Sequence, residues 1–159
     1  MITINVIGLP QPQGSMKSLG ARAGRTILTH SNGATLMPWR QELANAALNA
    51  RPDDWDLGAA MALSLTFRFP RPAGHYRKDG SVRPSAPMAK LTKPDLDKLV
   101  RACGDAFAGI LYHGDQQIVS TASAKRFVVG TEAPGLLATI IPLVSHPHPQ
   151  TEPAAQAGP

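Results

Sequence analysis

Residues 96–110 combine an apolar stripe with a row of charges, and this pattern predicts an amphipathic helix. At roughly 100° per residue, the apolar side chains fall within one arc and the charged ones lie on the other side. Such a helix is stable only when a second layer of structure covers its apolar stripe. The chain is therefore expected to fold in layers. The stripe comprises Leu96, Leu99, Val100, Cys103, Ala106, Phe107 and Ile110.

Short segments rich in β-branched and other apolar residues predict the strands that supply the second layer. They span residues 2–7, 25–29, 59–69, 117–129 and 135–144. A second helix is expected from about 38 to 50, because Pro38 suits a first helical turn and Pro52 ends the pattern. Trp39 is expected to anchor this helix in the core. Residues 70–93 show almost no periodicity and are expected to form a functional loop.

The composition of the 159 residues indicates one domain. Hydrophobic residues make up 43% and charged residues 17%, which excludes collagen-like and largely disordered chains. We expect the domain to span residues 1–144 and the Pro-rich residues 145–159 to be a disordered tail. Cys103 is the single cysteine, so a reducing cytoplasm is the expected compartment. No apolar run reaches the roughly 20 residues that span a bilayer, so we expect no membrane partner.

The charged side of the predicted helix has a plain structural explanation. Thr92-x-x-Asp95 resembles a helix capping box. Asp97, Arg101 and Asp105 follow at the i, i+4, i+8 spacing of a solvated salt-bridge ladder. Capping and solvation therefore account for three of the aspartates without any chemistry.

Asp115 lies outside that explanation, because it follows Gly114 just before a strand, where we expect no helix for it to cap. Carboxylates at the start of a helix and at the start of a neighbouring strand can converge on hard divalent cations, which prefer oxygen ligands. A metal held there would activate water against a phosphodiester. A basic side chain, Arg101 or Lys125, would bind the scissile phosphate. The spacing thus favours metal-assisted phosphodiester hydrolysis, with a turn aspartate as the structural alternative.

The same residues resemble the RusA family of Holliday junction resolvases, which phages and prophages often encode. The resemblance rests on the run KPDLDKL at residues 93–99, on Asp105-Ala106-Phe107, and on Asp115-x-Gln117-Ile118. It is strong over residues 92–125 and weaker at the N-terminus, and it covers most of residues 1–144. It implies a single domain of the α/β (α+β) class, with a mixed β-sheet packed against helices.

The resemblance also implies a Mg²⁺-dependent endodeoxyribonuclease, with Mn²⁺ as an alternative ion. Such an enzyme acts as a homodimer in the cytoplasm of a bacterial or phage-infected cell and makes symmetric paired nicks in a four-way DNA junction. Arg101 stands where the family has a lysine, which keeps the charge and changes the geometry. Gly114 replaces the first of two consecutive aspartates that are common in the family. The implied metal ligands are Asp95, Asp97, Asp115 and Asp105, and the implied catalytic residues are Asp95, Asp97, Asp115 and Arg101.

Positive charge leads into the acidic segment. Residues 68–93 hold seven Lys or Arg against the single acid Asp79, and the net charge of the chain is +5. Basic contacts to phosphates give strong, sequence-independent binding. Four-way or branched DNA is therefore expected to enter along this loop, with a solvated basic loop as the alternative. The expected DNA-binding residues are Lys93, Lys98, Lys125, Arg71, Arg77, Lys78, Arg83 and Lys90.

Two alternatives to a resolvase stay open. A branched-DNA-binding module would use its acids only for capping and solvation. A nuclease of relaxed specificity would cut DNA without resolving junctions. The variant Asp115→Asn separates binding from cleavage, because a nuclease would lose cleavage and still bind DNA, whereas a binding module would bind as well as before or more tightly.

Overall fold

A four-stranded mixed sheet of order β1-β6-β4-β5 forms one layer of the computed structural model, which describes residues 1–22 and 25–143. β6 is antiparallel to β1 and to β4, whereas β4 and β5 are parallel. Parallel neighbours need a long crossover connection, and the chain between β4 and β5 provides it. The predicted α+β domain with a mixed sheet is confirmed. The strands are β1 (Ile2–Ile7), β4 (Ala60–Phe69), β5 (Ile118–Phe127) and β6 (Gly135–Leu143).

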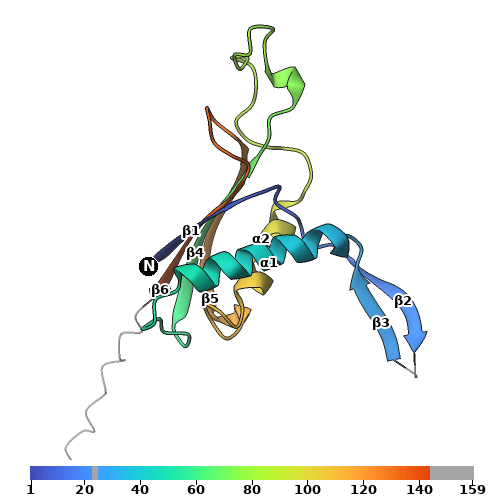
Figure 1. The fold of residues 1–159 in the computed structure, drawn as a ribbon, viewed down its shortest axis with the longest axis vertical. Helices are drawn as coiled ribbons and strands as arrows, with labels where there is room; N and C mark the ends of the chain where they lie inside the picture. Colours follow the sequence, from blue (N-terminus) through green and yellow to red (C-terminus); the bar gives the residue numbers. More distant parts are fainter. Residues whose placement is uncertain (23–24, 144–159) are drawn as a thin grey trace, which may run out of the picture.

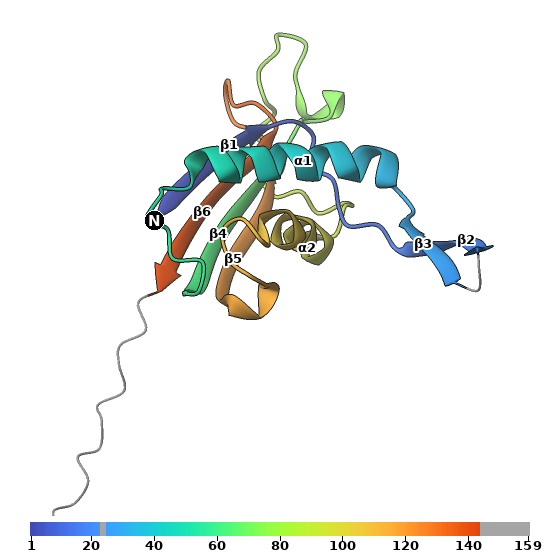
Figure 2. The ribbon, with the colours of Figure 1, turned by 60° about the horizontal axis from the view of Figure 1, so that its bottom comes forward.

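Two helices, α1 (Gly33–Ala50) and α2 (Leu96–Phe107), cover one face of this sheet (Figures 1 and 2). They pack against each other, α1 also contacts β1, and α2 also contacts β5. The core between helices and sheet contains the expected anchor Trp39, which is 5% exposed. It also contains the apolar stripe of α2, which confirms the predicted amphipathic helix. The buried stripe residues are Leu99, Cys103, Ala106 and Phe107.

Helix α1 begins at Gly33, earlier than the expected position near residue 38. Asn32 is the N-cap residue of the helix, although its side chain makes no capping hydrogen bond. Pro38 lies inside the helix and removes one intrahelical hydrogen bond. Leu36 on the added turn is fully buried, so its packing offsets that loss.

A separate antiparallel hairpin joins β2 (Met16–Arg22) to β3 (Arg25–His30) and projects away from the sheet (Figure 1). β3 was expected, and β2 was not. The Gly and Pro residues at positions 8–14 indicate a break, and the run MKSLGAR has no clear apolar alternation. This segment is a strand because its backbone pairs with β3, and the residue pattern within the segment does not indicate that pairing.

The connection from α2 to β5 differs from the expected pattern. α2 ends at Phe107 rather than at 110, and Gly109 follows in the left-handed region with a φ of +77°. Asp115 begins a short 3-10 helix, η2 (Asp115–Gln117), so the expectation that no helix starts there is wrong. β5 accordingly runs from 118 to 127 rather than from 117 to 129.

An arm formed by residues 70–95 projects from the end of β4 (Figure 1). Its helical content before α2 is one turn, η1 (Ala73–His75), so the predicted loop is otherwise confirmed. The arm returns beside β5, where Ala89 forms a bridge with Arg126. The predicted tail at residues 145–159 lies outside the described residues. No helix in the described part of the chain is long and apolar enough to cross a membrane.

Candidate functional site

An acidic pocket of about 500 Å³ opens between α2 and β5. Asp97 and Asp105 reach it from the exposed side of α2, and Arg101 lines it between them. Asp115 lines it from η2. The fold thus brings together three aspartates and one arginine of the predicted site. The hydroxyl-bearing Thr121 and Ser123 complete the lining from β5.

Gln117 holds the turn that carries Asp115. Its side-chain Oε1 accepts hydrogen bonds from two backbone N–H groups, and its Nε2 donates to two backbone carbonyls. The partners are the N–H groups of His113 (2.7 Å) and Gly114 (3.2 Å), and the carbonyls of Leu57 and Ala59 (2.9 Å each). Gln117 belongs to the Asp-x-Gln-Ile run noted in the sequence, although its pattern does not reveal this bracing role.

Tyr112 ties the same connection to α2. Its buried hydroxyl donates to the carbonyl of Gly104 at 2.9 Å. Burial raises the pKa of Tyr112 well above its usual range, and the nearby Cys103, Asp115 and Asp105 raise it further. Tyr112 therefore stays a neutral hydrogen-bond donor, which keeps the turn beside the helix that bears the other carboxylates.

The salt-bridge ladder on α2 does not form. Among the described residues, Arg101 makes no ion pair, whereas Asp105 pairs with Arg40 of α1 at 2.6 Å. Arg40 was missed as a site residue because it lies far from Asp105 in the sequence, and no local spacing connects them. The charge of Asp105 is therefore partly neutralised, while Asp97 and Arg101 stay available to a ligand.

Asp95 faces a different pocket. It occupies the N-cap position of α2, but its side chain makes no capping hydrogen bond, so the Thr92-x-x-Asp95 capping box is absent. Its carboxylate pairs instead with Lys98 at 3.1 Å. The hydrogen bond from Lys98 holds the pKa of Asp95 below its ordinary value, and the charges of Lys98, Lys93 and Lys125 lower it further.

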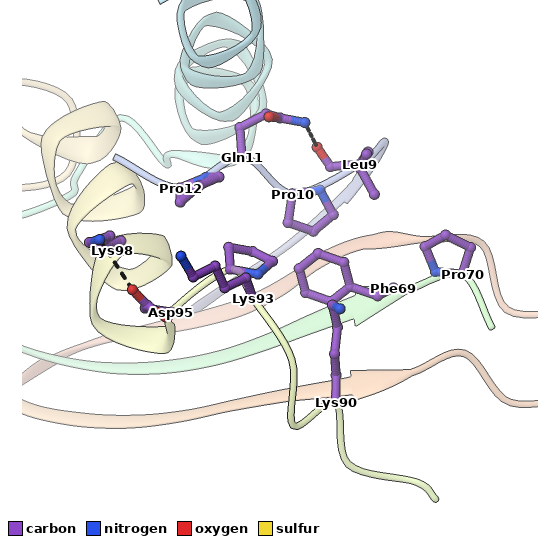
Figure 3. Close-up of a pocket in the computed structure, with 11 residues that line it drawn as sticks. Leu9, Pro10, Gln11, Pro12, Phe69, Pro70, Lys90, Lys93, Asp95 and Lys98 are labelled. Carbon is purple, nitrogen blue, oxygen red and sulfur yellow. Dashed lines mark hydrogen bonds and ion pairs between the residues drawn. The ribbon is translucent and has the colours of Figure 1, made fainter. Parts of the chain in front are cut away.

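This second pocket, of about 520 Å³, lies between the segment after β1, the end of β4 and the start of α2 (Figure 3). Three of the predicted DNA-binding residues, Lys90, Lys93 and Lys98, line it. Lys125 does not line this pocket, but it donates to the carbonyls of Thr92 (3.0 Å) and Pro94 (2.7 Å). Lys125 thus fixes the backbone that carries Lys93 and Asp95.

The remaining predicted DNA-binding residues lie on the arm and divide into two groups. Arg71 donates to the carbonyls of Val128 and Pro87 at 3.0 Å each, and Arg83 donates to the carbonyl of Tyr76 at 3.0 Å. These two arginines hold the arm in shape. Arg77 and Lys78 are exposed near its tip and make no ion pair or side-chain hydrogen bond with any described residue.

The donors of the acidic pocket suit a hard cation, because carboxylate and hydroxyl oxygens are the ligands that Mg²⁺ prefers. Asp97 and Asp115 make no side-chain ion pair or hydrogen bond with the described residues. Residues 1–22 and 25–143 hold no group of three or more His, Cys, Asp or Glu side chains that would bind one ion together. The donor chemistry fits a divalent cation, with water or substrate phosphate completing its coordination.

Carboxylates that suit a divalent cation, with three lysines lining a neighbouring pocket, supply what hydrolysis of a nucleic acid phosphodiester needs. Comparison with known families identifies the family of enzymes to which the chain belongs. The family model described as endodeoxyribonuclease RusA matches residues 9–140, which is most of the chain. The chain therefore belongs to the RusA family of endodeoxyribonucleases. A search of curated proteins gave no match.

Proposed function

We propose that this chain is a Mg²⁺-dependent endonuclease that resolves four-way DNA junctions by symmetric paired nicks. The observation that carries the proposal is the acidic pocket, where Asp97, Asp105, Asp115 and Arg101 meet. Family membership supports DNA as the substrate class. Branched-DNA binding without cleavage and cleavage of relaxed specificity are the competing outcomes of the test below.

Each residue has a distinct role in this proposal. Asp97 and Asp115 hold the metal, which when bound supplies an activated water and neutralises charge on the phosphate. Arg101 binds the scissile phosphate, since its guanidinium is free of protein partners among the described residues. Asp105 contributes a more distant negative charge, because Arg40 engages it at 2.6 Å. Asp95 joins the set when it leaves Lys98, an exchange that phosphate bound to Lys98 would favour.

The basic residues divide by role in the same way. Lys93, Lys98, Arg77 and Lys78 contact DNA phosphates. Lys125 supports the backbone next to the site, and Lys90 donates to the Thr92 hydroxyl at 2.8 Å. Two catalytic pockets related by a two-fold axis would match the two strands that a junction presents, which is the reason to propose a homodimer.

The test compares a synthetic four-way junction with a linear duplex of the same sequence, with and without Mg²⁺. Wild type is set against Asp97→Asn, with Asp53→Asn as the matched control, because Asp53 is exposed and lines neither pocket. We expect paired nicks in the junction that require Mg²⁺, vanish in Asp97→Asn and persist in Asp53→Asn. Binding without cleavage under any divalent ion would support the binding module, and equal cleavage of the duplex would support a relaxed nuclease.

A further inference from the structure

The pocket shown in Figure 3 is separate from the acidic pocket and has different chemistry. Consecutive residues at the start of α2 divide the two: Asp95 lines one, and Leu96 and Asp97 line the other. Most of the wall of the pocket in Figure 3 is apolar. Four proline rings, one phenylalanine and one leucine form that wall, namely Pro10, Pro12, Pro70, Pro94, Phe69 and Leu9.

The wall is rigid and has few polar groups. Pro10 is fully buried and Phe69 is 3% exposed, so both are held by the core. Proline has no N–H to donate, so four prolines leave the wall with few backbone donors. Gln11 is the polar uncharged residue of the lining, and its Nε2 already donates to the carbonyl of Leu9 at 3.1 Å. Such a wall suits a flat apolar ligand and does not distinguish hydrogen-bonding patterns.

The rim carries excess positive charge. Lys90, Lys93 and Lys98 face one carboxylate, Asp95, which Lys98 already engages at 3.1 Å. The ammonium of Lys90 lies 5.1 Å from the centre of the Phe69 ring, which holds it against the wall. Lys93 makes no ion pair or side-chain hydrogen bond with the described residues, and it extends toward Pro12 and the first turn of α2 (Figure 3). The rim therefore has a cation available for an anionic ligand.

A ligand with a flat apolar part and an anionic group would match the wall and the rim of this pocket. A nucleotide has both parts. A volume of about 520 Å³ is within the range of small-ligand sites, so one nucleotide fits. A paired base is unavailable, because its faces are stacked in the duplex and its edges are bonded to the partner strand. An unpaired base can leave the stack and lie against an apolar or aromatic surface, while its phosphate meets basic side chains.

We propose that this pocket binds one unpaired nucleotide at the branch point of the DNA, with its base against the proline wall and its phosphate on Lys93 and Lys98. The inference rests on the proposed function, because it assumes a branched substrate. It adds a substrate subsite next to the acidic pocket. An occupant there would lie beside the strand to be cut, so the pocket would select branched DNA over duplex by requiring a base that can leave the stack.

The test uses a four-way junction with 2-aminopurine at a branch-point position, bound to the full chain without divalent ions. This base analogue brightens when it leaves the stack. We expect saturating wild type to increase its fluorescence about threefold or more, and Leu9→Asp and Lys93→Ala to abolish most of that increase. Leu48→Asp is the matched control for the first variant, since Leu48 is 55% exposed and Leu9 is 54% exposed. Lys78→Ala controls for the second, because it should weaken binding and leave the fluorescence at saturation unchanged.

Two results would overturn the inference: no increase with wild type, or equal increases in the pocket variants and Leu48→Asp. Both are distinct from failure of the proposed function, which is read from Mg²⁺-dependent nicking of the same junction. Wild type that nicks the junction but leaves the analogue stacked refutes the subsite alone. Circular dichroism of each variant checks that Leu9→Asp and Lys93→Ala fold, and Leu9→Ser replaces the first if it does not.

Discussion

The guanidinium of Arg40 on α1 lies 2.6 Å from the carboxylate of Asp105 on α2, so one of the three aspartates in the acidic pocket already has a cation. The side chains are 19% and 35% exposed, and a partly exposed pair of this kind contributes about 0.5 kcal/mol to stability. The larger effect of the pair is on charge. Arg40 partly neutralises Asp105, whereas Asp97 and Asp115 make no ion pair with the described residues.

This difference predicts unequal effects of removing each carboxylate. Asp105→Asn should retain cleavage within about tenfold of wild type, because Arg40 already neutralises that charge. Asp97→Asn and Asp115→Asn should lower the rate by about a thousandfold or more, because each removes a metal ligand. Single-turnover cleavage over a range of Mg²⁺ concentrations measures both effects. Equal losses in all three variants would contradict the division of roles.

The bracing of Asp115 by Gln117 predicts a combined loss of stability and activity. Gln117→Ala removes hydrogen bonds to four backbone groups and should cost about 1–3 kcal/mol of unfolding free energy. Cleavage should fall as well, since Asp115 would no longer be held in place. Gln116→Ala, at the exposed neighbouring position, should change neither. Thermal unfolding and cleavage assays on both variants check this, and similar melting temperatures for the two would refute it.

Gly114 offers a gain-of-function test. Its φ of −161° is extended backbone that any residue adopts, and the group that an added Cβ would meet is the flexible end of Gln116. Gly114→Asp should therefore fold, and it should lower the Mg²⁺ concentration needed for half-maximal cleavage by adding an oxygen donor beside Asp115. Gly114→Asn, of the same size without the charge, is the control. An unchanged Mg²⁺ requirement in Gly114→Asp would count against this account.

Glu132 should shape acid stability. Its carboxylate accepts two hydrogen bonds from Arg126, at 2.6 and 2.7 Å, and one from the backbone N–H of Val129. These contacts lower the pKa of Glu132 from 4.5 to about 2, with the Arg126 hydrogen bonds as the largest cause. A depressed folded-state pKa means that this stabilisation is present above pH 4.5 and is lost as the pH falls toward 2.

Urea unfolding between pH 6 and 2 measures this effect. The free energy of unfolding should fall less steeply in Glu132→Gln than in wild type over that acid range, because the variant has no carboxylate to protonate. Glu42→Gln, on the exposed side of α1, should follow the wild-type curve. Parallel curves for wild type and Glu132→Gln would show that the Arg126 contact does not set this slope.

The two groups of arm arginines predict separable phenotypes. Arg71→Ala should destabilise the fold by about 1–3 kcal/mol, because the Arg71 guanidinium bonds to the backbone of Val128 and Pro87. Arg77→Ala should leave stability unchanged and weaken junction binding, with a shallower salt dependence that corresponds to one lost phosphate contact. Melting curves and salt titrations of binding distinguish the two. Weaker binding without destabilisation in Arg71→Ala would reverse its assignment.

Much of the fold was predictable because its signals are local. The apolar stripe of α2 and the alternation in β1 and β4 depend on residues within one element, and those elements appear where expected. The misplaced start of α1 and the missed strand β2 have the opposite origin. Burial of Leu36 and backbone pairing with β3 decided them, and both depend on segments elsewhere in the chain.

The chemistry that is available can be seen in the amino-acid sequence: four aspartates near one helix, a basic arm, and the motifs that resemble the RusA family. The pocket that each of these groups lines, and the protein partner that it contacts, depend on the tertiary structure. It placed Asp95 in the lysine-rimmed pocket, paired Asp105 with Arg40, and turned Arg71 and Lys125 inward. The physical reason is sequence separation: Lys125 meets Pro94 across 31 residues, and Arg71 meets Val128 across 57, so the folded sheet and helices must form before either contact exists.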